Sequence, residues 1–218
     1  MRERRSLILS LEDFMKFTSY IWDFDGTLFD SYPHTSAAFE AILDRDHIPY
    51  DHKTVLDCLM VTYKKAREHF GLSDQQFKDF IALEPIYSNK PIPEPFSGAC
   101  AVLRAITEAG GKNFLYTLRN DLARAYLKWY GMDKYFAGIV DSTMHFPGKP
   151  APDAVEHICR NYKLDKDQTV MIGDRICDLS SGWNAGCKTC HLLTPAAPQY
   201  PACDWRIENY QQMLELLK

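Results

Sequence analysis

The sequence predicts an α/β protein of three layers, in which a parallel sheet lies between helices and a helical domain is inserted. Two observations predict the sheet. Short, continuous apolar runs recur along the chain, as in strands buried on both faces, and from about residue 97 onward they alternate with amphipathic helical patterns. One observation predicts the insertion. Nearly ninety residues separate the first two strands, although a crossover needs only about a dozen.

The predicted strands share a continuous apolar character and lie at Tyr20–Trp22, Phe114–Leu118, Gly138–Val140, Thr169–Ile172 and Thr189–Leu193. Helical patterns lie between them. The first, Gly98–Gly110, predicts a crossover helix with inward-facing Val102, Leu103 and Ile106. Asn120 can cap a second helix that would bury Leu122, Tyr126, Trp129 and Tyr130. Pro152 can open a third that would bury Val155, Ile158, Cys159 and Tyr162.

Residues 31–96 are helical in pattern throughout. Their apolar residues form three stripes, which are Ala38, Phe39 and Ile42, then Leu56, Leu59, Met60, Tyr63 and Phe70, then Phe77, Phe80 and Ile81. The proline-rich stretch NKPIPEPFSG then leads back to the sheet. We therefore expect a core formed by residues 1–30 and 97–218, in which residues 1–14 are an N-terminal extension, and a helical domain at 31–96.

Composition and charge exclude several classes of protein. A net charge of −4 without a long basic run predicts neither a nucleic-acid nor a membrane partner, and no segment approaches the roughly 20 apolar residues of a membrane span. The seven cysteines are odd in number and scattered, which favours a reducing, cytoplasmic location. Cys187 and Cys190 form a C-x-x-C that lacks a second pair, so we expect buried strand cysteines rather than a metal or redox site.

The stretch IWDFDGTLFDS places two aspartates at the end of the first predicted strand. Residues two apart in a strand point the same way, so Asp23 and Asp25 would converge at the carboxyl edge of the sheet, where open α/β sheets bind ligands. Two adjacent carboxylates repel and need a cation or a shared proton. Gly26 would let the backbone turn sharply. Taken alone, the stretch could equally be a solvated Asp-x-Asp-Gly turn.

Other strand ends carry polar side chains that are expected at the same edge. Thr117 ends the second strand, Arg119 follows it, and Lys149 lies in a loop before a helix. Asp174 ends another strand, and Asp178 comes four residues later. A hydroxyl, an ammonium and four carboxylates are typical of an oxygen-ligated divalent cation, most consistently Mg²⁺, that faces a polyanionic group. Singly, Thr117 could be strand-end packing and Asp178 a helix cap.

With these motifs in this order, the sequence resembles the haloacid dehalogenase superfamily in its capped phosphatase branch, which includes phosphoglycolate phosphatases and β-phosphoglucomutases. The matching motifs are DFDGT at 23–27, Thr117 after a strand, Lys149 in GKPAPD and GDRICD at 173–178. The resemblance covers the chain from Tyr20 to about Leu193. It implies a Rossmann-like core and makes residues 31–96 a cap domain.

The resemblance also implies site roles. Asp23 would be the nucleophile that becomes an aspartyl-phosphate, and Asp25 the acid and base. Mg²⁺ would be held by Asp23, by the main-chain carbonyl of Asp25 and by Asp174, with Asp178 ligating directly or through water. An acid such as Asp25 is absent from the dehalogenases of the superfamily, so its presence favours phosphate transfer over carbon–halogen cleavage.

Thr117 and Lys149 would bind the phosphoryl group, and Lys149 would also hold Asp23 in line. Arg119 has two open interpretations: a further cation beside the phosphate, or an exposed residue in the first turn of a helix. The family often has Asn directly after the hydroxyl residue, whereas here Leu118 intervenes. Related capped enzymes can hold the bond before the proline in the cis form, and we expect the same of Lys149–Pro150.

The expected function is therefore Mg²⁺-dependent hydrolysis of a small phosphomonoester. A sugar-phosphate mutase with the same core remains an alternative, as does a catalytically silent regulatory module. We expect a small phosphorylated metabolite as the partner, and a monomer or homodimer. Candidate substrate contacts in the helical domain are His34, Lys64, Lys65, Arg67 and Tyr87, each of which could equally belong to a solvated helix face.

Overall fold

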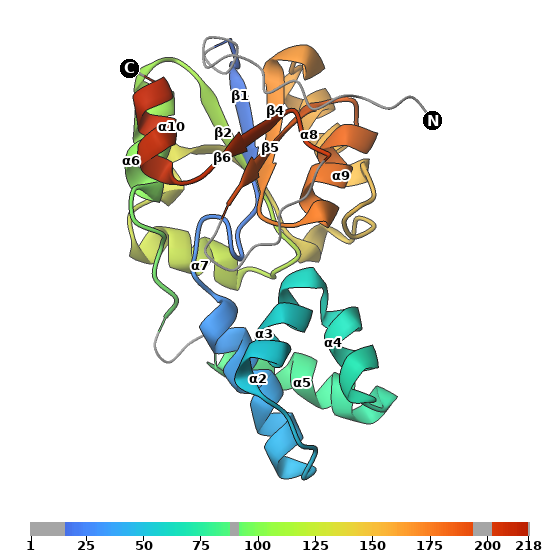
Figure 1. The fold of residues 1–218 in the computed structure, drawn as a ribbon. Helices are drawn as coiled ribbons and strands as arrows, with labels where there is room; N and C mark the ends of the chain where they lie inside the picture. Colours follow the sequence, from blue (N-terminus) through green and yellow to red (C-terminus); the bar gives the residue numbers. More distant parts are fainter. Residues whose placement is uncertain (1–15, 88–91, 194–201, 218) are drawn as a thin grey trace. The chain divides into compact units, whose positions relative to one another are not determined.

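The computed structural model describes residues 16–87, 92–193 and 202–217. The chain divides into two compact units (Figure 1). We call Met1–Leu28 with Pro95–Lys218 the core unit, and Phe29–Glu94 the helical unit. The N-terminal extension expected at residues 1–14 lies outside the described residues.

The core unit is built on a sheet whose described strands are all parallel, in the order β3-β2-β1-β4-β5-β6. The strands are β1 Ser19–Trp22, β2 Lys112–Tyr116, β3 Phe136–Val140, β4 Thr169–Gly173, β5 Lys188–Leu192 and β6 Trp205–Ile207. The first five confirm the predicted strands. The prediction missed β6, because its three residues alternate between buried Trp205 and Ile207 and exposed Arg206 and thus lack a continuous apolar run.

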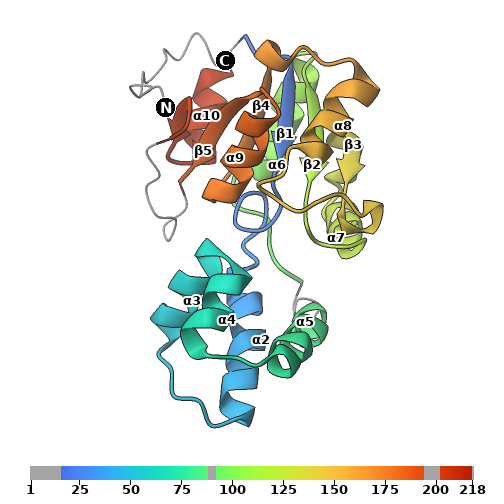
Figure 2. The same cartoon turned by 90° about the vertical axis from the view of Figure 1, so that its right-hand side faces the viewer.

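Helices cover both faces of this sheet (Figure 2), which confirms the three-layer α/β fold. They are α6 Ala99–Glu108, α7 Leu122–Trp129, α8 Asp153–Tyr162, α9 Ile176–Asn184 and α10 Tyr210–Leu216. In Figure 1 the sheet lies between α6 and α10 on one side and α8 and α9 on the other. Ile21, Phe114 and Met171 pack under α8, while the Trp22 indole stacks on Tyr210 of α10.

Two predicted core residues are instead exposed. In α7 the buried residues are Ala123, Tyr126 and Leu127; Trp129 follows two residues later, on the opposite side of the helix, and is 73% exposed. Tyr162 ends α8 and is 40% exposed. Its ring packs on Phe114 at the side of the sheet where β3 is the edge strand, so one side of the ring stays open to solvent.

The helical unit contains α2 Tyr32–Arg45, α3 His52–Val61, α4 Tyr63–Phe70 and α5 Asp74–Tyr87. Its centre includes Phe39, Leu59 and Phe80, all fully buried, whereas Ile81, a member of the third predicted stripe, is 46% exposed. The second predicted stripe is divided between α3 and α4. Thr62 causes the break: its backbone is extended, and its hydroxyl accepts the Lys65 N–H to cap α4.

All seven cysteines lie among the described residues and are free. Cys190 is buried in β5, as predicted, and Cys187 is buried just before that strand. Its sulfur lies 3.7 Å from that of Cys159. Within the described part of the chain, no helix has the length and apolar character that a membrane crossing requires.

Candidate active site

The end of β1 positions the first two aspartates. β1 lies between β2 and β4, so its carboxyl end is at the middle of the sheet edge. The Asp23 N–H still bonds to the Ile172 carbonyl of β4 at 2.9 Å, which fixes Asp23 at the last ladder position. Three residues later the chain turns at Gly26, whose φ of 78° favours glycine. Asp23 and Asp25 are therefore held at the edge where ligands bind in such sheets.

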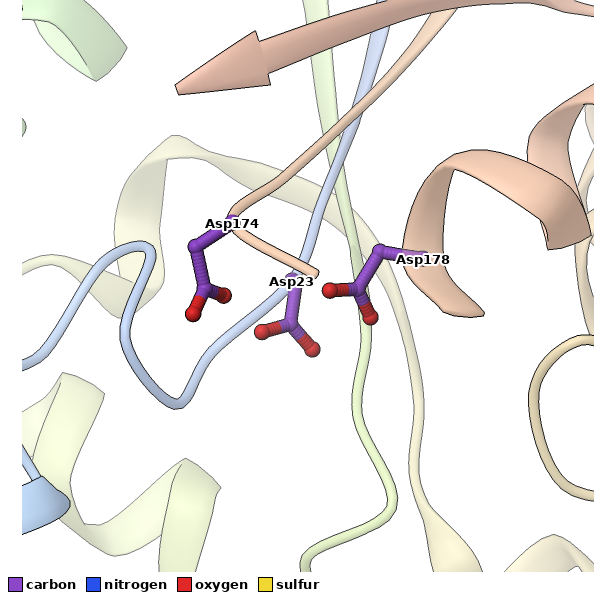
Figure 3. Close-up of side chains that lie close together, drawn as sticks. All are labelled: Asp23, Asp174 and Asp178. Carbon is purple, nitrogen blue, oxygen red and sulfur yellow. The ribbon is translucent and has the colours of Figure 1, made fainter. Parts of the chain in front are cut away.

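Three carboxylates converge at this edge (Figure 3). Asp23 follows β1, Asp174 follows β4 and Asp178 lies in the first turn of α9. All three are buried, and one oxygen of each lies within 4.8 Å of the others. Gly173 permits this approach, because a Cβ at that position would clash with the Cβ of Asp178. The Arg175 N–H donates to Asp178 Oδ2 at 3.0 Å, so Asp178 also caps α9.

Lys149 lies among these carboxylates with its side chain fully buried. Its ammonium contacts Oδ1 of Asp23 and lies 2.8 Å from Oδ1 of Asp178. It also lies 4.6 Å from the centre of the Tyr116 ring. Burial alone would lower the pKa of Lys149, but Asp178 and Asp23 outweigh it and hold that pKa above its ordinary value. The Lys149–Pro150 bond is cis, which confirms the prediction.

The environment of Asp23 fits a divalent cation. Burial, followed by the nearby Asp178 charge, raises the pKa of Asp23 to about 7. Its Oδ2 is buried and has no hydrogen-bond partner among the described residues. Lys149 offsets one charge of three carboxylates, and the donors are all oxygen atoms, as Mg²⁺ requires. Asp23, Asp174 and Asp178 could therefore hold Mg²⁺.

Further residues, which the sequence did not single out, support this cluster. The Thr27 hydroxyl donates to Asp174 Oδ1 at 3.0 Å, and the Tyr210 hydroxyl of α10 donates to the Thr27 carbonyl at 2.6 Å. His191 of β5 contacts the Asp174 carbonyl through Nε2 at 2.9 Å. The DFDGT motif contains Thr27 and could have indicated it, but no local pattern marks Tyr210 or His191.

The structure contradicts one of the two interpretations of Arg119. It is not an exposed residue of a helix turn, because its side chain is only 5% exposed and it precedes α7. Its guanidinium pairs with the Asp25 carboxylate, with Nη2 2.6 Å from Oδ1. The main-chain N–H of Arg119 donates to the Thr117 hydroxyl at 3.0 Å. Direct binding of phosphate by Arg119 and Thr117 stays a prediction.

Several of the candidate substrate contacts of the helical unit have local partners. Arg67 pairs with Asp74, and Lys64 lies 3.7 Å from Glu68 with its side chain 82% exposed. Nδ1 of His34 lies 3.3 Å from the Tyr87 carbonyl. The contacts of Arg67 and Lys64 fit a solvated helix face, and a role in substrate binding stays a prediction.

Comparison with known proteins identifies the family. The family model described as haloacid dehalogenase-like hydrolase matches residues 20–192. The chain belongs to this family. A pyrophosphatase PpaX of Halalkalibacterium halodurans is 24% identical over 80% of this chain and 83% of its own length. A phosphoglycolate phosphatase of Neisseria meningitidis is 29% identical over 76% of each chain. Family membership confirms the predicted resemblance and the assignment to the hydrolases.

Solved structures agree with this assignment. The crystal structure of a hydrolase from Streptococcus pneumoniae is 31% identical, with a TM-score of 0.60, over 80% of this chain and 91% of the other. A predicted phosphoglycolate phosphatase from Haemophilus somnus has a TM-score of 0.77 over 93% of this chain and 99% of the other, at 20% identity. The second likeness concerns the fold alone.

Proposed function

We propose that the protein is a Mg²⁺-dependent hydrolase of a small phosphate ester that works through an aspartyl-phosphate. The observation that carries this proposal is the environment of Asp23. One oxygen contacts the Lys149 ammonium, while the other is buried without a hydrogen-bond partner among the described residues, beside Asp174 and Asp178. A carboxylate held in this way is oriented and only partly compensated, as a nucleophile at a metal centre needs to be.

In the proposed first step, Asp23 attacks phosphorus and the leaving oxygen departs, protonated by Asp25 when it needs a proton. In the second step, Asp25 takes a proton from water, which hydrolyses the aspartyl-phosphate. Lys149 keeps Asp23 aligned and offsets negative charge as the phosphoryl group transfers. Thr117, at the end of the neighbouring strand β2, is proposed to donate to a phosphoryl oxygen.

Asp23, Asp174 and Asp178 would hold Mg²⁺, together with the main-chain carbonyl of Asp25. When bound, the ion offsets negative charge on the carboxylates and on the phosphoryl oxygens. The proposed partner is a small phosphorylated metabolite, with the helical unit acting as a cap. Relatives named pyrophosphatase and phosphoglycolate phosphatase support testing phosphoanhydrides beside phosphomonoesters. A cytoplasmic location and a monomeric or homodimeric state stay predictions.

The test begins with a screen of the purified protein for phosphate release. Sugar phosphates, nucleotides, phosphoglycolate and pyrophosphate are compared with Mg²⁺ and after exhaustive chelation. Release that depends on Mg²⁺ supports the proposal, and full activity after chelation contradicts it. Isomerised product without phosphate release would indicate a mutase. Failure to form any Mg²⁺-dependent phospho-enzyme would indicate a silent module.

Two variants then separate the aspartates. Asp23→Asn removes the nucleophile and should abolish the phospho-enzyme. Asp25→Asn should give a burst of nitrophenol from p-nitrophenyl phosphate, because that leaving group needs little protonation, followed by turnover slowed by roughly 10² to 10⁴. Mass analysis of the quenched enzyme should find phosphate on Asp23. Asp133→Asn, at an exposed aspartate, is the control. Burst-free loss in both site variants would contradict the role of Asp25.

A further inference from the structure

We propose that Arg119 is a positioning residue that holds the carboxylate of Asp25 in its working orientation, rather than a ligand of the substrate. The inference rests on the proposed function, because it gives Asp25 the acid and base role. It assigns Arg119 an effect on catalysis that passes entirely through Asp25.

The contact between the two side chains is a fork. Arg119 Nη2 lies 2.6 Å from Asp25 Oδ1, and Nε lies 3.1 Å from Oδ1 and 3.3 Å from Oδ2. Both carboxylate oxygens therefore receive a donor from one planar group. A guanidinium that binds a carboxylate through two nitrogens constrains its orientation as well as its place. Rotation of the Asp25 carboxylate would break at least one of these hydrogen bonds.

Arg119 is itself held at several points, so it can act as a fixed support. Its N–H donates to the Thr117 hydroxyl at 3.0 Å, and its carbonyl accepts the Ser142 N–H at 3.1 Å. The backbone is thus tied to the segments that follow β2 and β3. The guanidinium carbon lies 5.9 Å from the centre of the fully buried Phe24 ring. These contacts restrict the guanidinium, which orients Asp25 in turn.

Burial separates this role from substrate binding. The Arg119 side chain is 5% exposed, whereas that of Asp25 is 19% exposed. In this pair the carboxylate is the more accessible partner. A ligand that arrives from solvent would therefore meet Asp25 before Arg119.

A double-mutant cycle tests the proposal with p-nitrophenyl phosphate as the probe. Arg119→Ala should show a burst of nitrophenol like that of Asp25→Asn, should lower kcat by about 10- to 100-fold because Asp25 is misplaced, and should not raise KM, because slower hydrolysis of the phospho-enzyme lowers kcat and KM together. In the Asp25→Asn background, the same change should alter kcat by less than about twofold. A substrate ligand would instead raise KM, and would lower kcat/KM by the same factor in both backgrounds. Either result overturns the proposal.

Arg119→Lys keeps the charge but loses the fork, and it covers the case in which Arg119→Ala does not fold. The kcat of Arg119→Lys should be lower than that of the wild type, and higher than that of Arg119→Ala if the latter folds. A wild-type kcat in Arg119→Lys would overturn the proposal, because charge alone would then suffice. Arg124→Ala is the control. Arg124 also pairs with an aspartate of the core unit, through Nε and Asp141 Oδ2 at 2.7 Å, and kcat of this variant should stay within about twofold of wild type.

Crystal structures of the wild type and of Arg119→Lys provide a readout that needs no turnover. The Asp25 carboxylate should rotate away from its wild-type orientation in the variant, and an unchanged, well-ordered carboxylate would overturn the proposal. This measurement also separates the two proposals. Absence of a phospho-enzyme in the wild type would remove the proposed function, whereas the support of Asp25 by Arg119 would still be decided by the carboxylate's orientation.

Discussion

In the metal-free protein, ionisation of Asp23 should destabilise the folded state as the pH rises. Burial and the Asp178 charge raise the pKa of Asp23 from 3.8 to about 7. Between these two values the folded state keeps a proton that the unfolded state loses, so the free energy of unfolding falls with increasing pH. This decrease in the free energy of unfolding is absent below a pH of about 4, grows as the pH rises to about 7, and stays constant above that. At about 1.4 kcal/mol for each pKa unit, it reaches about 4 kcal/mol.

The assay is urea unfolding in the presence of a chelator at pH 5.5 and pH 8. Between these values, linkage predicts a loss of about 2 kcal/mol from Asp23 alone. Other groups also titrate, so the matched control is Asp23→Asn, which replaces the carboxyl by a neutral group of the same shape. The wild type should lose about 2 kcal/mol more than this variant.

Mg²⁺ should reverse the loss, because it binds the ionised carboxylate. At about 100 times its dissociation constant it should add about 2.7 kcal/mol to the wild type at pH 8, and far less to Asp23→Asn. Parallel pH dependences in the two proteins would refute the raised pKa of Asp23. Equal stabilisation by Mg²⁺ in both would refute its place in the metal site.

Three further substitutions test the packing around the site. Lys149→Met should lower the metal-free free energy of unfolding by about 3–5 kcal/mol, because it leaves buried carboxylates without their cation; urea unfolding measures this, and an unchanged midpoint would contradict it. Gly173→Ala should cost about 1–3 kcal/mol by overpacking against Asp178 and weaken Mg²⁺ binding, both measurable in one thermal titration. Tyr210→Phe, which removes the hydrogen bond to the Thr27 carbonyl, should cost about 1 kcal/mol; a loss of activity without this loss of stability would mean that Tyr210 acts elsewhere.

The sequence alone predicted the sheet and the acidic cluster, and the reason is geometrical. Parallel strands deliver their carboxyl ends to one edge of a sheet, so residues that follow separate strands come together whatever the detailed packing. Asp23, Lys149, Asp174 and Asp178 are examples, and the structure brings them into one cluster. Periodicity likewise predicted α6, because its apolar stripe recurs within a few turns of one helix.

Only the tertiary structure decided which side chains meet across the fold. Arg119 pairs with Asp25 over 94 residues of sequence, and Tyr210 supports Thr27 over 183. Trp129 fits an apolar helix pattern, yet it faces solvent because no described residue of the core unit covers that side of α7. Local sequence determines the direction of a side chain within its own element. Its partner and its burial depend on elements that folding brings from elsewhere in the chain, and no local pattern records those contacts.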